Sequence, residues 1–167
     1  MRIRRATSAD IPQIRKLEDR ATTAAHWTQG QYDSLFSSDA PARVVLVATS
    51  EAATSEVATS EPVESLVLGF LVARCLLDEW EIENVVVDEA ARRRGVGSSL
   101  VRQLAAEARA AGAAAVILEV RESNAPAQQL YESIGFSIEG RRKDYYYGPT
   151  EDALLFRLPL QSCNKSP

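Results

Sequence analysis

The sequence predicts an α/β fold in which helices flank a central sheet, and two strand–loop–helix units predict it. In the first unit, the β-branched run Val85–Val87 is followed by a polar turn, by the segment Arg92–Gly97 and by a helical pattern that opens at Ser98. In the second unit, the alternating pattern of residues 114–120 precedes a helix start at Ser123–Pro126. Because strands and helices alternate along this half of the chain, a layered domain is expected.

The size and composition are those of a globular domain. The chain has 167 residues, of which 46% are apolar and 25% are charged, so it can bury a core without disulfides. Residues 47–61 repeat the pattern x-Ala-Thr-Ser-Glu three times, which is too polar for a core. We therefore expect one domain over residues 1–160, a low-complexity hairpin insertion at residues 50–64 and a disordered tail at residues 161–167.

Charge and hydropathy argue against several classes of partner. A formal net charge of −4 argues against nucleic acid, because nucleic-acid-binding proteins carry broad basic surfaces. No apolar run is long enough to span a membrane, and Met1 is followed by a polar segment rather than by a signal-peptide core. Cys75 and Cys163 lack metal-ligand spacing. The expectation is a cytoplasmic protein with no metal, no nucleic acid and no membrane partner.

The remaining elements follow in chain order. A first helix starts near Thr7, has Pro12 in its first turn and places Ile11, Ile14 and Leu17 on one buried face. Strands are expected at residues 2–6, 43–49, 65–75, 80–87, 114–120, 136–139 and 153–158. Further helices are expected around residues 32–36, at residues 98–111 and at residues 124–134. Gly69 marks a position where a bulge would fit the third strand.

The segment Arg92–Gly97 predicts a site for phosphate. Two closely spaced glycines allow backbone N–H groups to approach a ligand, and the following helix contributes free N–H groups and the positive end of its dipole. The adjacent arginines can pair with phosphate oxygens. The spacing fits neither the dinucleotide-binding fingerprint nor the P-loop. On the residues alone, a solvated basic turn that begins a helix is an equally good interpretation.

Other residues invite chemical interpretations. Glu119 interrupts an apolar strand on the face opposite Val116, Leu118 and Val120, and a carboxylate there needs partners or a task. His26 is expected to be a loop or partly buried residue rather than a catalytic one. Trp27 fits either the core or an aromatic wall for a substrate.

Together, the V-V-V-D run, R-x-x-G-x-G and the segment L-E-V-R-x-S-N-x-x-A-x-x-L-Y-E-x-x-G-F resemble the GNAT acyltransferases. The segments 118–136 and 141–153 are similar to the bacterial ribosomal-protein-alanine N-acetyltransferases within that family. The resemblance implies a GNAT fold, a central mixed and mostly antiparallel sheet with about four flanking helices. It also implies that acetyl-CoA is the cosubstrate. The implied cosubstrate contacts are Val85, Val86, Val87, Arg92, Arg93, Arg94, Gly95, Val96, Gly97, Ser98 and Asn124.

The same resemblance implies the catalytic groups. Glu119 matches the family's general base and Tyr131 its general acid, while Glu83, on the central strand, is the second choice for the base. Without the resemblance, Tyr131 fits simple core packing. Tyr145 and Tyr146 match the region that holds the acceptor backbone, and Trp27 lies in the loop expected opposite it.

These residue types suit transfer to an N-terminal amine. The amine must be neutral to attack a thioester. An α-amino group has a pKa near 8, so its pKa exceeds pH 7 by only about 1 unit, whereas the pKa of a lysine side chain exceeds it by about 3.4 units. A strand carboxylate can take the amine proton, and a tyrosine can protonate the departing thiolate. The expected function is Nα-acetylation of a protein N-terminus, such as an alanine of a ribosomal protein. The alternatives are acetylation of a small-molecule amine and a non-catalytic acyl-CoA-binding module.

Overall fold

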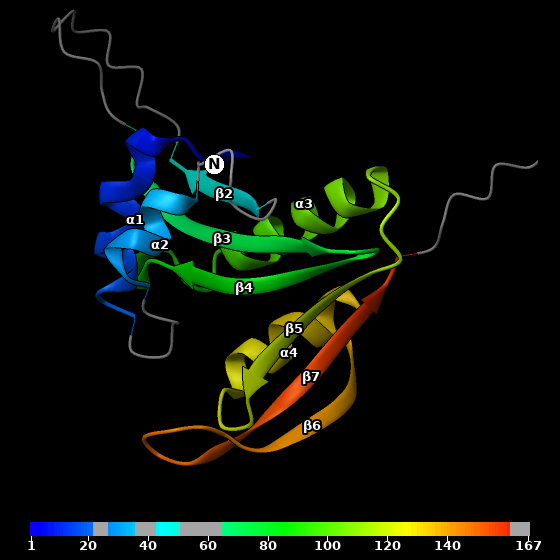
Figure 1. Ribbon diagram of the computed structural model, residues 1–167. Helices are drawn as coiled ribbons and strands as arrows, with labels where there is room; N and C mark the ends of the chain where they lie inside the picture. Colours follow the sequence, from blue (N-terminus) through cyan, green and yellow to red (C-terminus); the bar gives the residue numbers. More distant parts are fainter. Residues whose placement is uncertain (22–26, 36–42, 51–64, 161–167) are drawn as a thin grey trace, which may run out of the picture.

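A mixed sheet of seven strands in the order β1-β2-β3-β4-β5-β7-β6 organises the chain (Figure 1). The computed structural model describes residues 1–21, 27–35, 43–50 and 65–160. Its strands are β1 (Arg2–Arg5), β2 (Arg43–Thr49), β3 (Val67–Leu76), β4 (Glu79–Val87), β5 (Ala115–Arg121), β6 (Ser137–Tyr146) and β7 (Glu151–Pro159). Its helices are α1 (Ile11–Glu18), α2 (Gln29–Ser34), α3 (Val96–Ala110) and α4 (Ala125–Ile134). The predicted fold class is confirmed.

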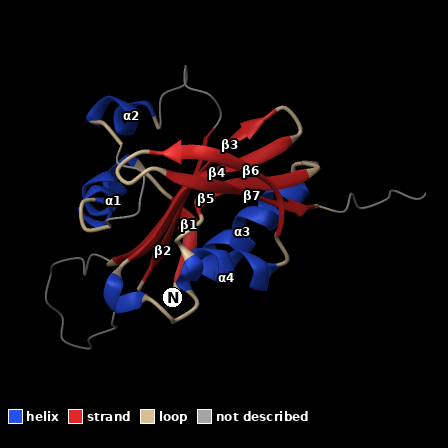
Figure 2. Ribbon diagram, turned by 90° about the horizontal axis from the view of Figure 1, so that it is seen from below, coloured by secondary structure: helices blue, strands red, loops and turns tan. Residues whose placement is uncertain are grey.

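The two faces of the sheet carry separate apolar cores. Helices α3 and α4 pack on one face, where Leu100 and Leu104 are fully buried against the sheet. Helices α1 and α2 lie on the other face (Figure 2), where Ile14, Tyr32 and Phe70 belong to a second buried cluster. The helical spacing of residues 11–17 and the alternation of the strands therefore produce two half-cores, and the sheet lies between them.

Strands β4 and β5 diverge after a short common ladder. They are the sheet's parallel pair, and their register runs from Glu79–Ala115 to Ile82–Leu118. Beyond that point β4 stays paired with β3 as far as Val87, while β5 stays paired with β7 as far as Arg121. The two strands consequently open into a V (Figure 1). The edge of β4 that faces β5 thus presents backbone groups outside the β4–β5 ladder.

A bulge at Glu83 changes which face the end of β4 presents. Val72 pairs with Asn84 and Ala73 with Ile82, so Glu83 is the extra residue. As a result Ile82 belongs to the α3 side, whereas Asn84 and Val86 face α1 on the opposite side of the sheet. The sequence predicted an uninterrupted strand here and contained no sign of this bulge.

Gly69 lies next to a second bulge, which was expected in this strand. The β2–β3 register shifts between Gly69 and Val67. A β-carbon at Gly69 would lie 2.8 Å from the carbonyl oxygen of Val86, closer than real contacts allow. The glycine therefore permits the close approach of β3 to β4 at this point.

The helix boundaries follow local signals, with one correction. Helix α3 begins at Val96, two residues before the predicted start at Ser98, because Gly95 adopts a left-handed conformation with φ 78° and serves as its N-cap. The side chain of Asn124 accepts a hydrogen bond from the Ala127 N–H at 3.2 Å and caps α4 as predicted. Gly97 thus lies in the first turn of α3.

The last strands also differ from the prediction. Strand β6 runs through both the predicted strand at residues 136–139 and the basic, aromatic segment that follows it. Its pairing with β7 is irregular between Arg142 and Tyr146, and Asp144 has a φ of 51°. Of the hairpin insertion predicted at residues 50–64, residues 51–64 lie outside the described residues, as do the tail at residues 161–167 and His26.

Candidate active site

A large cavity lies between the end of β4 and the N-terminal ends of α3 and α4. Its volume is about 870 Å³. The predicted cosubstrate contacts that line it are Val85, Val86, Val87, Arg92, Arg93, Gly95, Val96, Gly97, Ser98 and Asn124. Arg94 is the one predicted contact that is not part of this lining. The cavity thus brings together residues of β4, α3 and α4. Tyr131 of α4 is one of the residues that line it.

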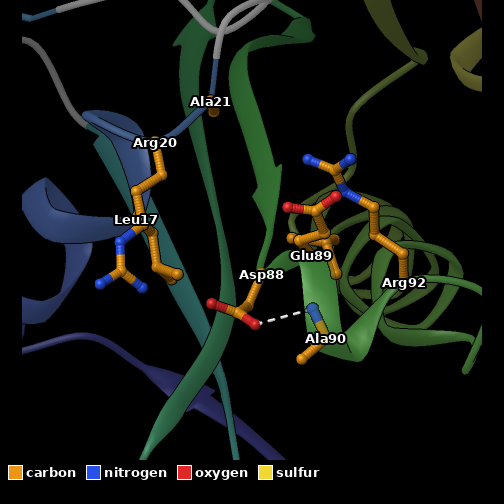
Figure 3. A pocket seen from close by; sticks show the side chains of 8 residues that line it. Leu17, Arg20, Ala21, Asp88, Glu89, Ala90 and Arg92 are labelled. Atoms are coloured by element: carbon orange, nitrogen blue, oxygen red, sulfur yellow. Dashed lines mark hydrogen bonds between the residues drawn. The ribbon is translucent and has the colours of Figure 1, made fainter.

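A smaller pocket of about 330 Å³ adjoins this cavity on the side of α1 (Figure 3). The two share Ala21, Val87 and Arg92. At its centre, the Asp88 carboxylate accepts a hydrogen bond from the Ala90 N–H at 2.9 Å and fixes the turn after β4. Arg92 therefore follows a rigid turn at the boundary between the two pockets.

The cavity fits a ligand that carries a diphosphate. The first N–H groups of α3 have no intrahelical partner, since the bond from Ser99 to the Gly95 carbonyl is the first of its ladder. A β-carbon at Gly97 would lie 3.3 Å from Leu130 Cδ2 and 3.6 Å from Val87 Cγ2, so a side chain would fill the passage between α3, α4 and β4. Bare backbone N–H groups beside arginines form an anion site.

Glu119 lies on the face opposite α3 and α4, where strand β6 holds its carboxylate. The Arg142 Nε lies 3.1 Å from Glu119 Oε1. The pKa of Tyr145 is raised mainly by its hydrogen bond to Glu119 and secondly by burial. The Arg142 guanidinium lies 5.4 Å from the centre of the Tyr145 ring. The carboxylate that the sequence marked as out of place in an apolar strand therefore has charged and polar partners.

Glu83, the alternative base, is more firmly occupied. Its carboxylate binds Arg43 through two contacts of 2.7 and 3.1 Å, and Arg74 Nε lies 3.6 Å away. Arg74 also pairs with Glu81 at 2.6 Å. Because Glu83 sits between two guanidinium groups and Glu119 beside one, the geometry favours Glu119 as the carboxylate that can change partners.

Tyr131 is a packed core residue that also lines the cavity. Its side chain is buried, and its ring lies 5.6 Å from Phe136 and 6.1 Å from Phe156. It also lines the cavity beside Asn124. Burial, and secondarily the neighbouring Tyr146, raises the pKa of Tyr131, so its hydroxyl stays protonated at neutral pH.

The aromatic residues predicted for the acceptor come from two ends of the same sheet face. Trp27 lies between α1 and α2, 5.5 Å from the Arg43 guanidinium. Tyr145 and Tyr146 lie near the end of β6 and make an edge-on contact at 5.1 Å. The charge of Glu81 on β4 also contributes to the raised pKa of Tyr145. They border the face that carries Glu119.

Sequence reasoning missed a buried polar pair beneath Trp27. Glu18 is 3% exposed and Asn84 is 6% exposed. Asn84 Nδ2 donates to Glu18 Oε1 at 3.0 Å, and the Trp27 N–H donates to Glu18 Oε2 at 3.1 Å. Helical spacing could have found this carboxylate, because Glu18 lies four residues after the buried Ile14.

These features define a cavity suited to a phosphate-bearing ligand between diverging strands, with a carboxylate on the adjoining face. Residues 11–136 match the profile of the acetyltransferase (GNAT) family. The chain therefore belongs to the GNAT acetyltransferase family.

The chain is similar to individual members of that family. It is 41% identical over 95 residues to the [ribosomal protein bS18]-alanine N-acetyltransferase of Escherichia coli K12, covering 54% of this chain and 63% of that protein. The chain thus matches just under two thirds of the relative's length. The crystal structure of the ribosomal-protein-S18-alanine N-acetyltransferase from Escherichia coli superimposes with a TM-score of 0.76 at 28% identity, covering 99% of this chain and 97% of that one.

A second solved structure is also similar. Ard1 from Thermoplasma volcanium has a TM-score of 0.76 at 26% identity, covering 96% of this chain and 97% of that one. Within the described parts of the chain, no helix has both the length and the apolar character needed to cross a membrane.

Proposed function

We propose that this protein is an acetyl-CoA-dependent N-acetyltransferase that modifies the α-amine of a protein N-terminus. One observation carries the proposal: the V between β4 and β5 joins a cavity suited to a diphosphate to a sheet face on which Glu119 lies beside Tyr145. The similarity to a ribosomal-protein-alanine N-acetyltransferase supports the choice of acceptor.

The chain's own residues divide the binding task. The N-terminal end of α3, with Arg92, Arg93 and Gly97, would hold the diphosphate of acetyl-CoA. The edge of β4 at Val85–Val87 offers backbone hydrogen bonds to the pantetheine arm, and Asn124 faces the same cavity. Holding both substrates in one geometry lowers the entropic part of the barrier.

Glu119 and Tyr131 would move the protons. The acceptor ammonium group first loses one proton to solvent. The neutral nitrogen then forms a bond to the thioester carbonyl carbon while the carbon–sulfur bond breaks, and Glu119 accepts the second proton that the nitrogen releases. Tyr131 donates its hydroxyl proton to the departing sulfur. The raised pKa of Tyr131 keeps that proton available at neutral pH. This direct transfer needs no covalent intermediate on the enzyme.

Acceptor binding requires an exchange of cations at Glu119. Arg142 occupies one carboxylate oxygen and its side chain is 54% exposed. An N-terminal ammonium group carries the same charge, so it can replace Arg142 without leaving Glu119 unpaired. Because an exposed ion pair is worth only about 0–1 kcal/mol, the exchange costs little.

The ion pairs of Glu81, Glu83 and Glu119 disfavour a polycationic small molecule as the acceptor. Selection of a polycation would require carboxylates that are free of cations, but the three candidates are already paired. The pairs are Glu81 with Arg74, Glu83 with Arg43 and Glu119 with Arg142. A peptide N-terminus brings a single charge, which matches the one pair whose arginine is largely exposed.

A peptide panel tests the proposal. Short peptides that begin with alanine are assayed for CoA release with a free or an acetylated N-terminus, beside a lysine-containing blocked peptide and a small diamine. Turnover of the free N-terminus alone is expected. Acetylation of lysine or of the diamine only would contradict the peptide assignment, and acetyl-CoA binding without turnover of any amine would indicate a binding module.

A further inference from the structure

The buried carboxylate Glu18 has no part in the chemistry described above, although it lies directly beneath the proposed acceptor wall. It ends helix α1 and is 3% exposed. A buried carboxylate is costly unless hydrogen bonds satisfy its oxygens. Here both oxygens are used, one by the Asn84 side chain and the other by the Trp27 backbone N–H.

These two bonds join three parts of the fold. Glu18 belongs to α1, Trp27 precedes α2, and Asn84 follows the bulged residue of β4. The Trp27 ring in turn contacts the Arg43 guanidinium, which binds Glu83 in the bulge. Glu18 therefore fixes Trp27 relative to the point at which β4 leaves β5.

We propose that Glu18 is a positioning residue for the acceptor, because it holds Trp27 against β4 at the wall of the acceptor site. The proposal rests on the proposed function, in which Trp27 contacts the acceptor peptide. Glu18 does not line the cavity assigned to acetyl-CoA. Its loss should therefore weaken acceptor binding and leave cosubstrate binding intact.

The geometry requires a carboxylate rather than an amide at this position. Both partners are donors, so both oxygens of residue 18 must accept. In Glu18→Gln the amide oxygen can serve only one partner, and the amide NH₂ then faces the other N–H. In the double variant Glu18→Gln/Asn84→Asp, the new amide donates to the carboxylate introduced on β4 and still accepts from the Trp27 N–H, so these two hydrogen bonds return.

The experiment compares Glu18→Gln with the swapped pair and with Asp10→Asn. Asp10 is a matched control, because it is also a buried carboxylate in the N-terminal segment but binds Arg4 and Thr7, away from Trp27. In Glu18→Gln, KM for the acceptor peptide should rise about tenfold, with the affinity for acetyl-CoA unchanged. The swapped pair should restore KM to near the wild-type value, and Asp10→Asn should not change it.

A spectroscopic measurement separates this inference from the proposed function. The chain has two tryptophans, so a Trp80→Phe background reports Trp27 alone. Acrylamide should quench Trp27 more strongly in Glu18→Gln than in the parent or in the Asp10→Asn control. Unchanged quenching with an unchanged acceptor KM would overturn the role of Glu18, even if peptides are acetylated. Altered quenching in a protein that acetylates no peptide would support the anchoring of Trp27 and contradict the proposed function.

The swapped pair keeps the test decisive if Glu18→Gln does not fold. It should fold, bind acetyl-CoA and show the quenching of the parent protein. A folded swapped pair with strongly exposed Trp27 would contradict the inference, because the hydrogen-bonding pattern would then be intact without positioning the ring.

Discussion

At the scale of single residues, the partners of each carboxylate decide its use. Glu83 binds Arg43, whose side chain is 18% exposed, while Glu119 binds Arg142, whose side chain is 54% exposed. An exposed partner can move into solvent when an acceptor arrives, whereas a partly buried one cannot leave without an uncompensated charge. Exchange at Glu119 is therefore the easier of the two.

Glu119→Gln should lower kcat by about 100-fold, since general-base catalysis contributes on that order. Its affinity for acetyl-CoA should change little, because Glu119 does not line the cavity. The measurement is CoA release from an acceptor peptide together with a direct cosubstrate titration. Glu83→Gln serves as the comparison, and a larger loss of kcat there, with full activity in Glu119→Gln, would move the base to Glu83.

Tyr131→Phe removes one hydroxyl group from a packed ring. The contacts with Phe136 and Phe156 are kept, so the melting temperature should stay close to that of the wild type. If the hydroxyl protonates the leaving thiolate, kcat should fall by about 100-fold with the acetyl-CoA affinity preserved. Thermal unfolding and steady-state kinetics check the two parts separately, and wild-type turnover would reduce Tyr131 to a core residue.

Local pattern identified Glu119 but not its partners. Strand alternation is enough to show that a carboxylate breaks an apolar strand, so residue 119 could be singled out from the sequence. Its pairing with Arg142 depends on the strand order β5-β7-β6, which no local pattern encodes. The same holds for Glu18, whose partner Asn84 is 66 residues away.

At the scale of elements, periodicity predicted the strands and helices better than their irregularities. Gly95 and Gly97 marked the turn before α3, but the helix starts at Val96 because Gly95 itself is the cap. The bulge at Glu83 has no glycine or proline to announce it. It arises from the pairing of β3 with β4, and pairing is a property of two strands rather than of either one.

The first turn of α3 gives a prediction about cosubstrate binding. Gly97→Asp introduces a side chain that points toward Leu130 and a negative charge at the proposed diphosphate site. Steric and electrostatic effects should together weaken acetyl-CoA binding by at least about tenfold. Gly97→Ala, in which the added β-carbon lies 3.3 Å from a flexible leucine methyl group, should have a smaller effect. Calorimetric titration of both variants with acetyl-CoA separates the steric effect from the effect of charge. Wild-type affinity in Gly97→Asp would place the diphosphate elsewhere.

At the scale of the whole molecule, the site exists because β4 and β5 pair only in their first halves and then separate. Composition and motifs could suggest the layers and the phosphate-binding loop, but the strand order and the V depend on the joint packing of both half-cores. Helix α3 packs mainly against one arm and α4 belongs to the other, so the cavity forms where the arms separate (Figure 1). Function therefore depends on tertiary pairing that the chain's local patterns only partly specify.

The stability of the folded molecule should depend on pH through carboxylates such as Asp10. Its oxygens accept from Arg4 at 2.7 and 2.8 Å and from the Thr7 N–H at 2.8 Å. The hydrogen bonds with Arg4, more than those with Thr7, lower the pKa of Asp10 below its ordinary value of 3.8. The unfolded chain then binds a proton before the folded one does. The stabilisation is complete above that ordinary value and is lost as pH falls through the lowered pKa.

Asp10→Asn should accordingly reduce the free energy of unfolding by about 1–2 kcal/mol at pH 7. The difference between wild type and variant should shrink as the pH falls below about 4. Urea unfolding at a series of pH values measures both quantities. Asp19→Asn, at an exposed position at the other end of α1, should stay within about 0.5 kcal/mol of the wild type. A gap between wild type and Asp10→Asn that persists unchanged into strong acid would show that packing at Asp10, rather than its charge, stabilises the first turn.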